Sequence, residues 1–338
     1  MVATVHELAS SATAVSYYEK DGYYAKNDAE HRKASFWHGG AAAGLGLRGH
    51  VAPSRFESVL SGKVPKTDIR LGRIVEGKHQ HRPGWDITFS APKSVSLEAL
   101  VMGRTDFIQA HDEAVRETLD WIEKTLLQTR GWEPETKRRP RVKAHGMVVA
   151  GFRHLTSRDL DPQLHTHCVL ANMTRNEKGE WRSLEPALLK RNEKLIGAHY
   201  RNELASRLLS QGVALTPRMI GPVPGFELAG YDQEFLDAFS GRRREILAYL
   251  DRHGLPHTRA ATQKATLHTR RRKVDAGLAE LVPQWRERAR ALGLGRDERA
   301  LMPPRPADPA TGEATPVPSH EGPALTKNER RKRRRAPA

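Results

Sequence analysis

Three histidines spaced along a short stretch of the chain could hold a metal ion. His165 and His167 alternate within 164–170, so on a strand both side chains lie on one face, with Cα atoms roughly 7 Å apart. His154 lies eleven residues before His165, and a polar turn around Pro162 could return the chain so that all three meet. Three imidazoles suit a divalent cation such as Mn, Zn, Ni or Co and leave positions open for substrate oxygens. The alternative is that the strand histidines only pack or form hydrogen bonds.

A cluster of tyrosines offers a second kind of chemistry. Four of the seven tyrosines fall within eight residues near the N-terminus, in a polar segment: Tyr17, Tyr18, Tyr23 and Tyr24. A phenol is a useful nucleophile toward phosphorus, because the aryl phosphodiester that forms keeps the energy of the broken bond and can be reversed. Its pKa of about 10 means that it needs a base or a metal at neutral pH. Packing or an interface contact is the alternative use of such a cluster.

Asp86 is the carboxylate that could assist either group. Trp85, Ile87 and Phe89 alternate with Asp86 and other polar residues, so 85–90 is predicted to be a strand with its apolar face buried. On the polar face, the carboxylate could take the phenolic proton or orient a histidine ligand. A solvated strand carboxylate is the plain alternative.

Further elements must position these residues. The ranges 142–152 and 164–173 also have the pattern of strands, whereas apolar residues recur at helical spacing in 107–128, 185–211 and 233–251. Helices and strands are mixed without regular alternation, which favours an α+β fold over a doubly wound sheet. The sequence has no GxxxxGK[ST] phosphate loop, so nothing indicates an ATP-driven motor.

Composition favours a polyanionic partner. Among 338 residues, 56 Lys+Arg stand against 40 Asp+Glu, and this formal charge of +16 excludes an acidic solvating protein. The single cysteine, Cys168, excludes an internal disulfide and a cysteine zinc cluster. No window approaches the roughly 20 apolar residues of a membrane span, and the N-terminus lacks a signal-peptide pattern. We therefore expect a soluble cytoplasmic protein.

Several basic residues are candidates for binding phosphate groups of a nucleic acid, although a charge run is more often a solvated helix face. They are Lys93, Arg153, Arg242, Arg243, Arg244, Arg270 and Arg271. Phe36, Trp37 and Trp85 could stack on bases, but Trp85 alternates with Ile87 and is expected in the core. Binding that uses such residues should weaken steeply with salt.

The end of the chain differs from the rest. The range 301–338 is rich in proline and poor in aliphatic residues, which predicts a disordered tail. Its last part, 327–335, has seven basic residues and one acidic residue, and could bind DNA nonspecifically or contact acidic proteins.

Taken in order, these motifs resemble the MobF-type conjugative relaxases, the TrwC/TraI class of HUH endonucleases. The similarity rests on 16–19 and 23–26 with the tyrosines, 84–96 around Asp86, and 152–154, 156–158 and 161–167 with the histidines. It runs from about residue 5 to residue 295.

The resemblance implies a central antiparallel sheet flanked by helices, with the metal on the sheet. It implies a relaxase domain over 1–300, in which about 230–300 is a helical part that closes over the bound DNA strand, followed by the tail 301–338. Family members usually continue into a helicase domain, so this chain is either a truncated domain or a natural short relaxase.

The implied activity is site- and strand-specific nicking of a plasmid transfer origin, which leaves a tyrosine joined to the 5′ phosphate and a free 3′ hydroxyl. By position, Tyr17 would be the initiating nucleophile and Tyr23 the leading candidate for the second transfer, with Tyr18 and Tyr24 adjacent to them. The metal triad would be His154, His165 and His167, assisted by Asp86.

The implied cofactor is a divalent ion such as Mg, Mn or Zn, with its identity open. The implied partners are single-stranded and hairpin transfer-origin DNA, accessory relaxosome proteins, a coupling protein and the secretion machinery. These would meet in a bacterial cytoplasm, with transport of the protein into a recipient cell left open. Two other readings remain: an HUH rolling-circle replication initiator or transposase, and a non-catalytic DNA-binding protein.

Overall fold

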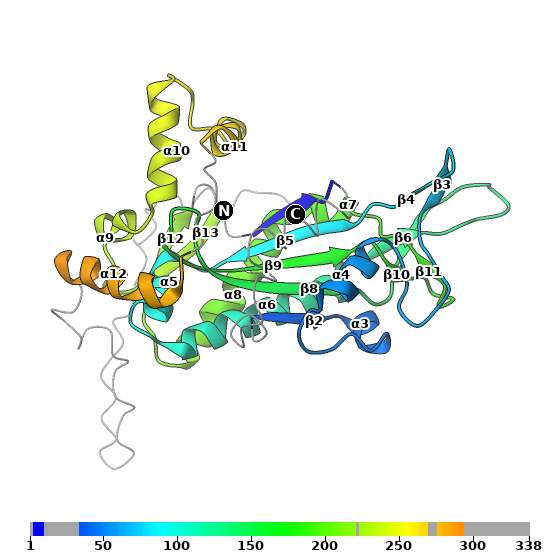
Figure 1. The fold of residues 1–338 in the computed structure, drawn as a ribbon, viewed down its shortest axis with the longest axis horizontal. Coiled ribbons are helices and arrows are strands. Elements are labelled where there is room, and N and C mark those ends of the chain that lie inside the picture. Colours follow the sequence, from blue (N-terminus) through cyan, green and yellow to red (C-terminus); the bar gives the residue numbers. More distant parts are fainter. Residues whose placement is uncertain (1–2, 10–33, 221–222, 270–275, 294–338) are drawn as a thin grey trace, which may run out of the picture. The chain divides into compact units, whose positions relative to one another are not determined.

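The structure, a computed structural model, describes residues 3–9, 34–220, 223–269 and 276–293. At its centre is a five-stranded antiparallel sheet with the strand order β1-β5-β9-β8-β2 (Figure 1). The strands are β1 (Ala3–Glu7), β2 (Ser35–His38), β5 (Gly84–Ser90), β8 (Val149–Thr156) and β9 (Pro162–Ala171). The α+β fold with a central antiparallel sheet is therefore confirmed.

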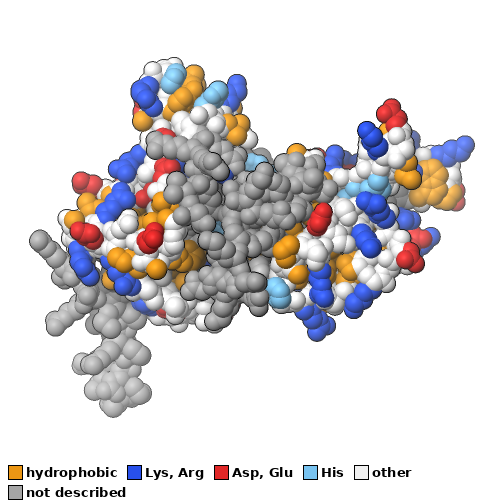
Figure 2. Space-filling model, viewed as in Figure 1, with side chains coloured by type: hydrophobic (Ala, Val, Ile, Leu, Met, Phe, Trp, Pro, Cys, Tyr) orange, Lys and Arg blue, Asp and Glu red, His pale blue; other side chains and the backbone are white. Residues whose placement is uncertain are grey.

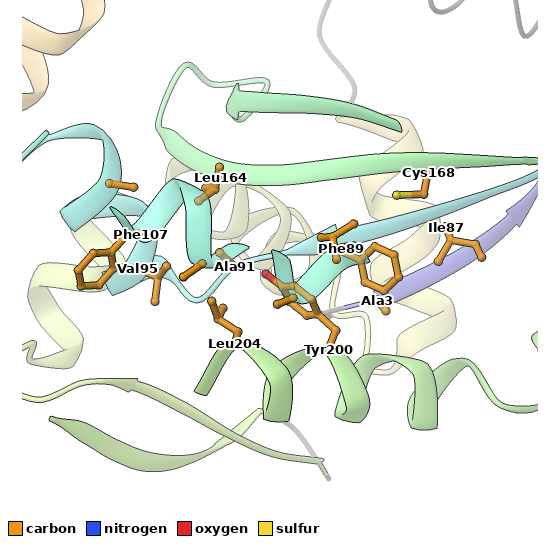
Figure 3. Packing of buried hydrophobic residues seen from close by; sticks show 14 of the residues in the cluster. Ala3, Ile87, Phe89, Ala91, Val95, Phe107, Leu164, Cys168, Tyr200 and Leu204 are labelled. Carbon is orange, nitrogen blue, oxygen red and sulfur yellow. The ribbon is translucent and has the colours of Figure 1, made fainter. Parts of the chain in front are cut away.

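One face of the sheet packs on helices that are buried against it. The apolar residues of β5, namely Trp85, Ile87 and Phe89, lie in this larger core, which α5 (Lys93–Leu100), α6 (Thr105–Thr125) and α8 (Glu193–Ser210) cover. Figure 3 shows Tyr200 and Leu204 of α8 pointing into this core toward the strands. Because the side chain of Trp85 is 0% exposed, this residue belongs to the core and cannot stack on a base.

The other face carries a smaller apolar cluster. Trp37, Phe152 and Val169 pack there against α3 (Gly40–Gly44) and α4 (Pro53–Leu60). Since side chains alternate along a strand, His165 and His167 lie on the same face as Val169. The apolar cluster therefore occupies one part of this face, and the histidines occupy another.

The predicted strand at 142–152 proves to be two strands. Arg141–Lys143 forms β7, which pairs with β6 (Gln128–Arg130) in a separate ribbon, and β8 begins only at Val149. Gly146 between them has φ +81°, a left-handed conformation that ends regular strand pairing. Two further ribbons are β3 (Arg73–Val75) with β4 (Lys78–Gln80), and β10 (Thr174–Arg175) with β11 (Trp181–Arg182).

The predicted helices are present, two of them in two pieces. The range 107–128 corresponds to α6, 185–211 to α7 (Ala187–Arg191) and α8, and 233–251 to α9 (Gln233–Ala238) and α10 (Gly241–Arg252). The hairpin of β12 (Leu215–Ile220) and β13 (Val223–Leu228) precedes α9. After α10 come α11 (Arg259–His268) and α12 (Leu278–Ala291). Among the helices that the structure describes, none is long and apolar enough to cross a membrane.

Candidate metal centre

His154, His165 and His167 converge on one point of the sheet. In the antiparallel register of β8 and β9, His154 lies directly opposite His165, and His167 is two residues further along β9. The three ring centroids are 5.2, 5.4 and 5.3 Å apart. One ring nitrogen from each residue lies within 4.8 Å of the other two, a group that could hold a metal ion. The structure thus brings together the three histidines that the sequence singled out.

Hydrogen bonds fix the tautomers of two of these rings. Nδ1 of His167 lies 2.7 Å from Oδ2 of Asp86, and Nδ1 of His165 lies 2.9 Å from the carbonyl oxygen of Gln163. An Nδ1–H that donates to a carboxylate or carbonyl leaves the lone pair on Nε2, as is usual for metal-binding histidines. Three partly exposed imidazoles without a thiolate suit a divalent ion that keeps positions open for substrate. His154, His165 and His167 therefore fit a divalent metal ion, as the sequence predicts.

Asp86 is buried beside the triad, with 8% of its surface exposed. Its Oδ2 accepts the hydrogen bond from His167, and Thr88 Oγ1 lies 3.4 Å from its Oδ1 and 3.0 Å from Nδ1 of His167. The sequence left two roles open for this carboxylate. The contact with His167 supports the role in which Asp86 orients a ligand.

Close pairing of β5 and β9 sets the distance between Asp86 and His167. Gly84 begins β5 with φ +149°, and a Cβ at this position would lie 2.0 Å from the carbonyl oxygen of Leu170. A side chain there would push the two strands apart. Glycine at position 84 therefore keeps the carboxylate within hydrogen-bond distance of the imidazole.

Sequence reasoning missed a buried polar chain on the opposite face of β9. His111 of α6 has Nδ1 2.6 Å from the hydroxyl of Tyr200 and Nε2 2.8 Å from Oγ1 of Thr166. Thr166 lies between His165 and His167 in the strand, so these hydrogen bonds support the segment with two candidate metal ligands from the opposite face of the sheet. Burial lowers the pKa of His111 to about 3, which keeps the ring neutral. Its position four residues before Val115, on the apolar stripe of the predicted helix, was the available signal.

The predicted nucleophiles Tyr17, Tyr18, Tyr23 and Tyr24 lie outside the described residues, as do Arg270, Arg271 and the tail 301–338. The two ends of the N-terminal segment are described. The N–H of Leu8 donates to the carbonyl of Gly84 at 3.1 Å, and the N–H of Arg153 donates to the carbonyl of Ala34 at 2.8 Å. Residues 9–33 therefore join the edge strand β1 to the edge strand β2, and the triad lies on the strands between these edges.

Interior contacts occupy two of the predicted phosphate ligands. Lys93 Nζ donates to the carbonyl of Pro162 at 2.8 Å, and desolvation lowers the pKa of this ammonium to about 8. Arg153 pairs with Asp112 of α6. These contacts do not support a role for either residue in binding a phosphate.

The three arginines at the start of α10 differ in their surroundings. Nη1 of Arg242 donates to the carbonyl of Thr269 and Nη2 to that of Thr266, both at 2.8 Å, so Arg242 joins α10 to the end of α11. Arg243 and Arg244 are exposed. Of the three, only these two present a surface charge that could meet a phosphate.

Comparison with protein families and solved structures places this geometry in a known context. The family model described as TrwC relaxase matches residues 11–292. A metal-bound structure of the conjugative relaxase TrwC in complex with oriT DNA is 34% identical, with a TM-score of 0.75, and the match covers 86% of this chain and 98% of that one. A copper-bound structure of the same complex, also 34% identical with the same coverage, gives a TM-score of 0.76. A complex of TrwC with a 27-mer comprising the recognition hairpin and the cleavage site is 33% identical, with a TM-score of 0.75 and the same coverage.

Curated relatives are much longer than this chain. The multifunctional conjugation protein TraI of Escherichia coli strain K12 is 32% identical over an alignment of 304 positions, and the match covers 86% of this chain and 16% of that protein. A second TraI from Escherichia coli is 32% identical over an alignment of 328 positions, and the match covers 91% of this chain and 18% of the relative. The chain thus spans less than a fifth of the length of these relatives.

Proposed function

The chain belongs to the TrwC relaxase family, and on this premise we propose that it nicks one strand of a plasmid transfer origin and later rejoins the ends. The observation that carries the proposal is the convergence of His154, His165 and His167 on one face of the sheet, with Asp86 holding the ring of His167. The similar TrwC structures are described as metal-bound and as complexes with oriT DNA, which is the chemistry this donor set suits.

Tyr17 is the proposed nucleophile. Its phenolic oxygen would lose its proton and attack the scissile phosphorus, the new P–O bond would replace the bond from phosphorus to the 3′ oxygen, and that oxygen would take up a proton and leave as a 3′ hydroxyl. The product is a 5′-phosphotyrosine. Because one phosphodiester is exchanged for another, the reverse reaction rejoins DNA without ATP.

The length of the N-terminal segment permits this role. Tyr17 is nine residues from Leu8, and nine extended residues reach about 30 Å. Neighbouring strands are about 4.8 Å apart, so the whole five-stranded sheet is only about 19 Å across between its edge strands. Leu8 is held beside Gly84 on β5, and β9 with two of the histidines is the next strand. Gly84 pairs with Ala171, six residues along β9 from His165, which adds an offset of about 20 Å along the strand. Together with the offset across the strands, this distance is still within the reach of Tyr17.

The described residues prepare the site for the ion. Asp86 would hold the ring of His167, and the carbonyl of Gln163 that of His165, with Nε2 directed toward the ion. The two rings then need no reorientation when the ion binds. A bound divalent ion would neutralise charge on a non-bridging oxygen of the scissile phosphate.

Other features of the activity extend the same proposal. Tyr23 would carry out the second strand transfer, with Tyr18 and Tyr24 as adjacent alternatives. The relaxase domain would occupy 1–300 and the basic tail 301–338. The protein would act in a bacterial cytoplasm with accessory relaxosome proteins, a coupling protein and the secretion machinery, and could travel with the DNA into a recipient cell.

DNA binding would draw on exposed basic side chains. On the face shown in Figure 2, Lys and Arg side chains lie over the region of α10 and α11 and over that of β3 and β4. Arg243 and Arg244 are the proposed phosphate contacts among the described candidates, together with Arg270 and Arg271. Affinity for a transfer-origin oligonucleotide should fall steeply with salt, because each neutralised phosphate releases counterions.

A denaturing gel tests the activity. A labelled single-stranded transfer-origin oligonucleotide with Mg²⁺ or Mn²⁺ should give a shortened product and a protein-linked band. Tyr17→Phe should abolish both while oligonucleotide binding stays nearly unchanged. Tyr249→Phe, which changes a tyrosine of α10 stacked on His253, is the matched control and should cleave normally.

The other outcomes separate the competing functions. Cleavage confined to a replication origin would favour a rolling-circle initiator. No adduct with any divalent ion would favour a non-catalytic DNA-binding protein. Full nicking by Tyr17→Phe would remove Tyr17 as the nucleophile.

A further inference from the structure

The turn between the two metal-bearing strands is held by helices that follow much later in the sequence. Residues 157–161 join β8 to β9, three residues after His154 and four before His165. Asp161, 5% exposed, lies at the end of this turn. Its Oδ2 accepts the backbone N–H of Gly241 at 2.6 Å, and its Oδ1 accepts a hydrogen bond from Nη1 of Arg288 at 3.2 Å. One buried carboxylate thus bridges the turn, α10 and α12.

A second bond from α12 holds the same turn. The indole N–H of Trp285 donates to the carbonyl of Leu160 at 2.9 Å. Leu160 has φ +60°, a left-handed conformation that a residue with a branched side chain rarely adopts without support. Within the turn, the N–H of Ser157 donates to the carbonyl of Asp161 at 2.9 Å. The shape of the turn therefore depends on partners inside and outside the hairpin.

Asp161 also completes the N-terminus of α10. Gly241 is the first residue of this helix, and the side chain of Ser240 before it makes no capping hydrogen bond. A carboxylate at this point satisfies an N–H that lacks a helical partner and complements the positive end of the helix dipole. Because a Cβ at Gly241 would lie 3.0 Å from Oδ2, the close approach suits glycine.

The position of α10 carries α11 with it. Arg242 near the start of α10 bonds to the carbonyls of Thr266 and Thr269, so the two helices form one unit, which we call the arm (Gly241–Arg252 and Arg259–His268). Figure 1 shows α10 and α11 standing next to each other, apart from the sheet. The arm bears Arg243 and Arg244, the exposed charges proposed to contact DNA.

We propose that Asp161 is a positioning residue that sets the arm in register with the hairpin that carries His154 and His165. This inference rests on the proposed function and deepens it. DNA held by the arm would then be placed relative to the histidines through one carboxylate, and loss of that link would leave DNA bound but poorly aligned for attack. Misalignment of about 1 Å is enough to slow a reaction on the order of a hundredfold.

The experiment compares Asp161→Asn with the wild-type full chain. Asn keeps the size of the side chain but lacks the charge, and its NH₂ group would face a donor from either Gly241 or Arg288. At saturating transfer-origin oligonucleotide and Mn²⁺, we expect the single-turnover cleavage rate to fall at least tenfold. The Kd for the oligonucleotide, measured in a Tyr17→Phe background, and the Kd for Mn²⁺ should each change less than threefold.

Two further variants keep the test decisive. Asp120→Asn removes a carboxylate of α6 that pairs with His38, outside both the arm and the turn, and it should leave the rate and both Kd values unchanged. Trp285→Phe keeps an aromatic ring at this buried position but removes the indole N–H bond to Leu160. The cleavage rate should fall about threefold while both Kd values stay nearly unchanged, even if Asp161→Asn fails to fold.

An unchanged rate in both Asp161→Asn and Trp285→Phe would overturn the inference. So would a fall in Mn²⁺ affinity that matches the fall in rate, because Asp161 would then act on the hairpin alone. If the wild-type protein cleaves no strand, the proposed function fails instead, which distinguishes the two failures.

Discussion

On one face of the central sheet, His111 has both ring nitrogens hydrogen-bonded inside the core. On the other face, His165 and His167 have Nδ1 engaged by protein oxygens, and their rings meet that of His154. Only Thr166 separates the two environments, since its hydroxyl contacts His111 while its neighbours in the strand are the candidate ligands. The comparison shows that histidine content alone does not indicate a metal site. The distinguishing feature is one ring nitrogen with an oxygen partner while another converges with nitrogens of other rings.

The strongest test of this contrast removes a candidate ligand. His165→Ala should lower affinity for a divalent ion by more than about a hundredfold, because a three-nitrogen donor set loses one member. Isothermal titration calorimetry with Mn²⁺ or Zn²⁺ would measure the change. His257→Ala, which changes an exposed histidine paired with Asp251, is the control and should bind metal normally. Equal affinity in wild type and His165→Ala would show that these rings do not form the site.

Asp86→Asn should have the next largest effect. Loss of the carboxylate that orients a metal-binding histidine typically costs about 10–100-fold in metal affinity. Asp120→Asn is a matched control, because Asp120 Oδ1 lies 2.8 Å from Nε2 of His38, a similar pair away from the triad. If the two variants bind metal equally well, the contact between Asp86 and His167 has no role in the site.

Thr88→Val tests the same histidine and should lower metal affinity less than Asp86→Asn does. The hydroxyl of Thr88 is a secondary partner of Nδ1 of His167, 3.0 Å away, while Asp86 remains at 2.7 Å. A single hydrogen bond of this kind contributes on the order of 1 kcal/mol, so metal affinity should fall no more than about fivefold. The same calorimetric titration applies, and a loss as large as that of Asp86→Asn would assign the hydroxyl an equal part in orienting the ring.

His111→Gln should leave metal affinity within about twofold and instead change how stability depends on pH. Because burial lowers the pKa of His111 from 6.5 to about 3, the unfolded chain binds a proton in this pH range that the folded protein does not. Stability should therefore fall as the pH drops below about 6.5, and His111 contributes up to about 1.4 kcal/mol per pH unit. Urea unfolding at pH 7 and pH 5 with EDTA should give a shallower dependence in His111→Gln. An identical dependence in both proteins would mean that His111 is not held neutral.

Much of this site could be predicted from the sequence. The period of two in 85–90 and 164–173 correctly assigned Trp85, Ile87 and Phe89 to one face, and placed the histidine pair on a strand. The alternation of side chains along a strand depends only on neighbouring residues, so it can be predicted without knowledge of the rest of the fold. The break of 142–152 was missed because Gly146 takes a left-handed φ that leaves no mark on the hydrophobic pattern.

The long-range partners could not be predicted. His111 meets Tyr200 across 89 residues and Thr166 across 55 residues, and Asp161 meets Gly241 across 80. No spacing rule connects such pairs, since they depend on how whole helices dock on the sheet. From the sequence alone, Lys93 was a candidate phosphate ligand. The fold shows instead that its ammonium donates a hydrogen bond to the carbonyl of Pro162, a contact that the sequence pattern does not indicate.

Gly84 has a consequence for how such a site can vary. Any larger residue would meet the carbonyl oxygen of Leu170, so substitution should damage the centre while every group that does chemistry is still present. A mutational scan scored by activity would then rank this position with the ligands, although it contributes no functional atom. The substitutions that this site can accept are therefore limited in part by position 84, where only a residue without a Cβ fits against the neighbouring strand.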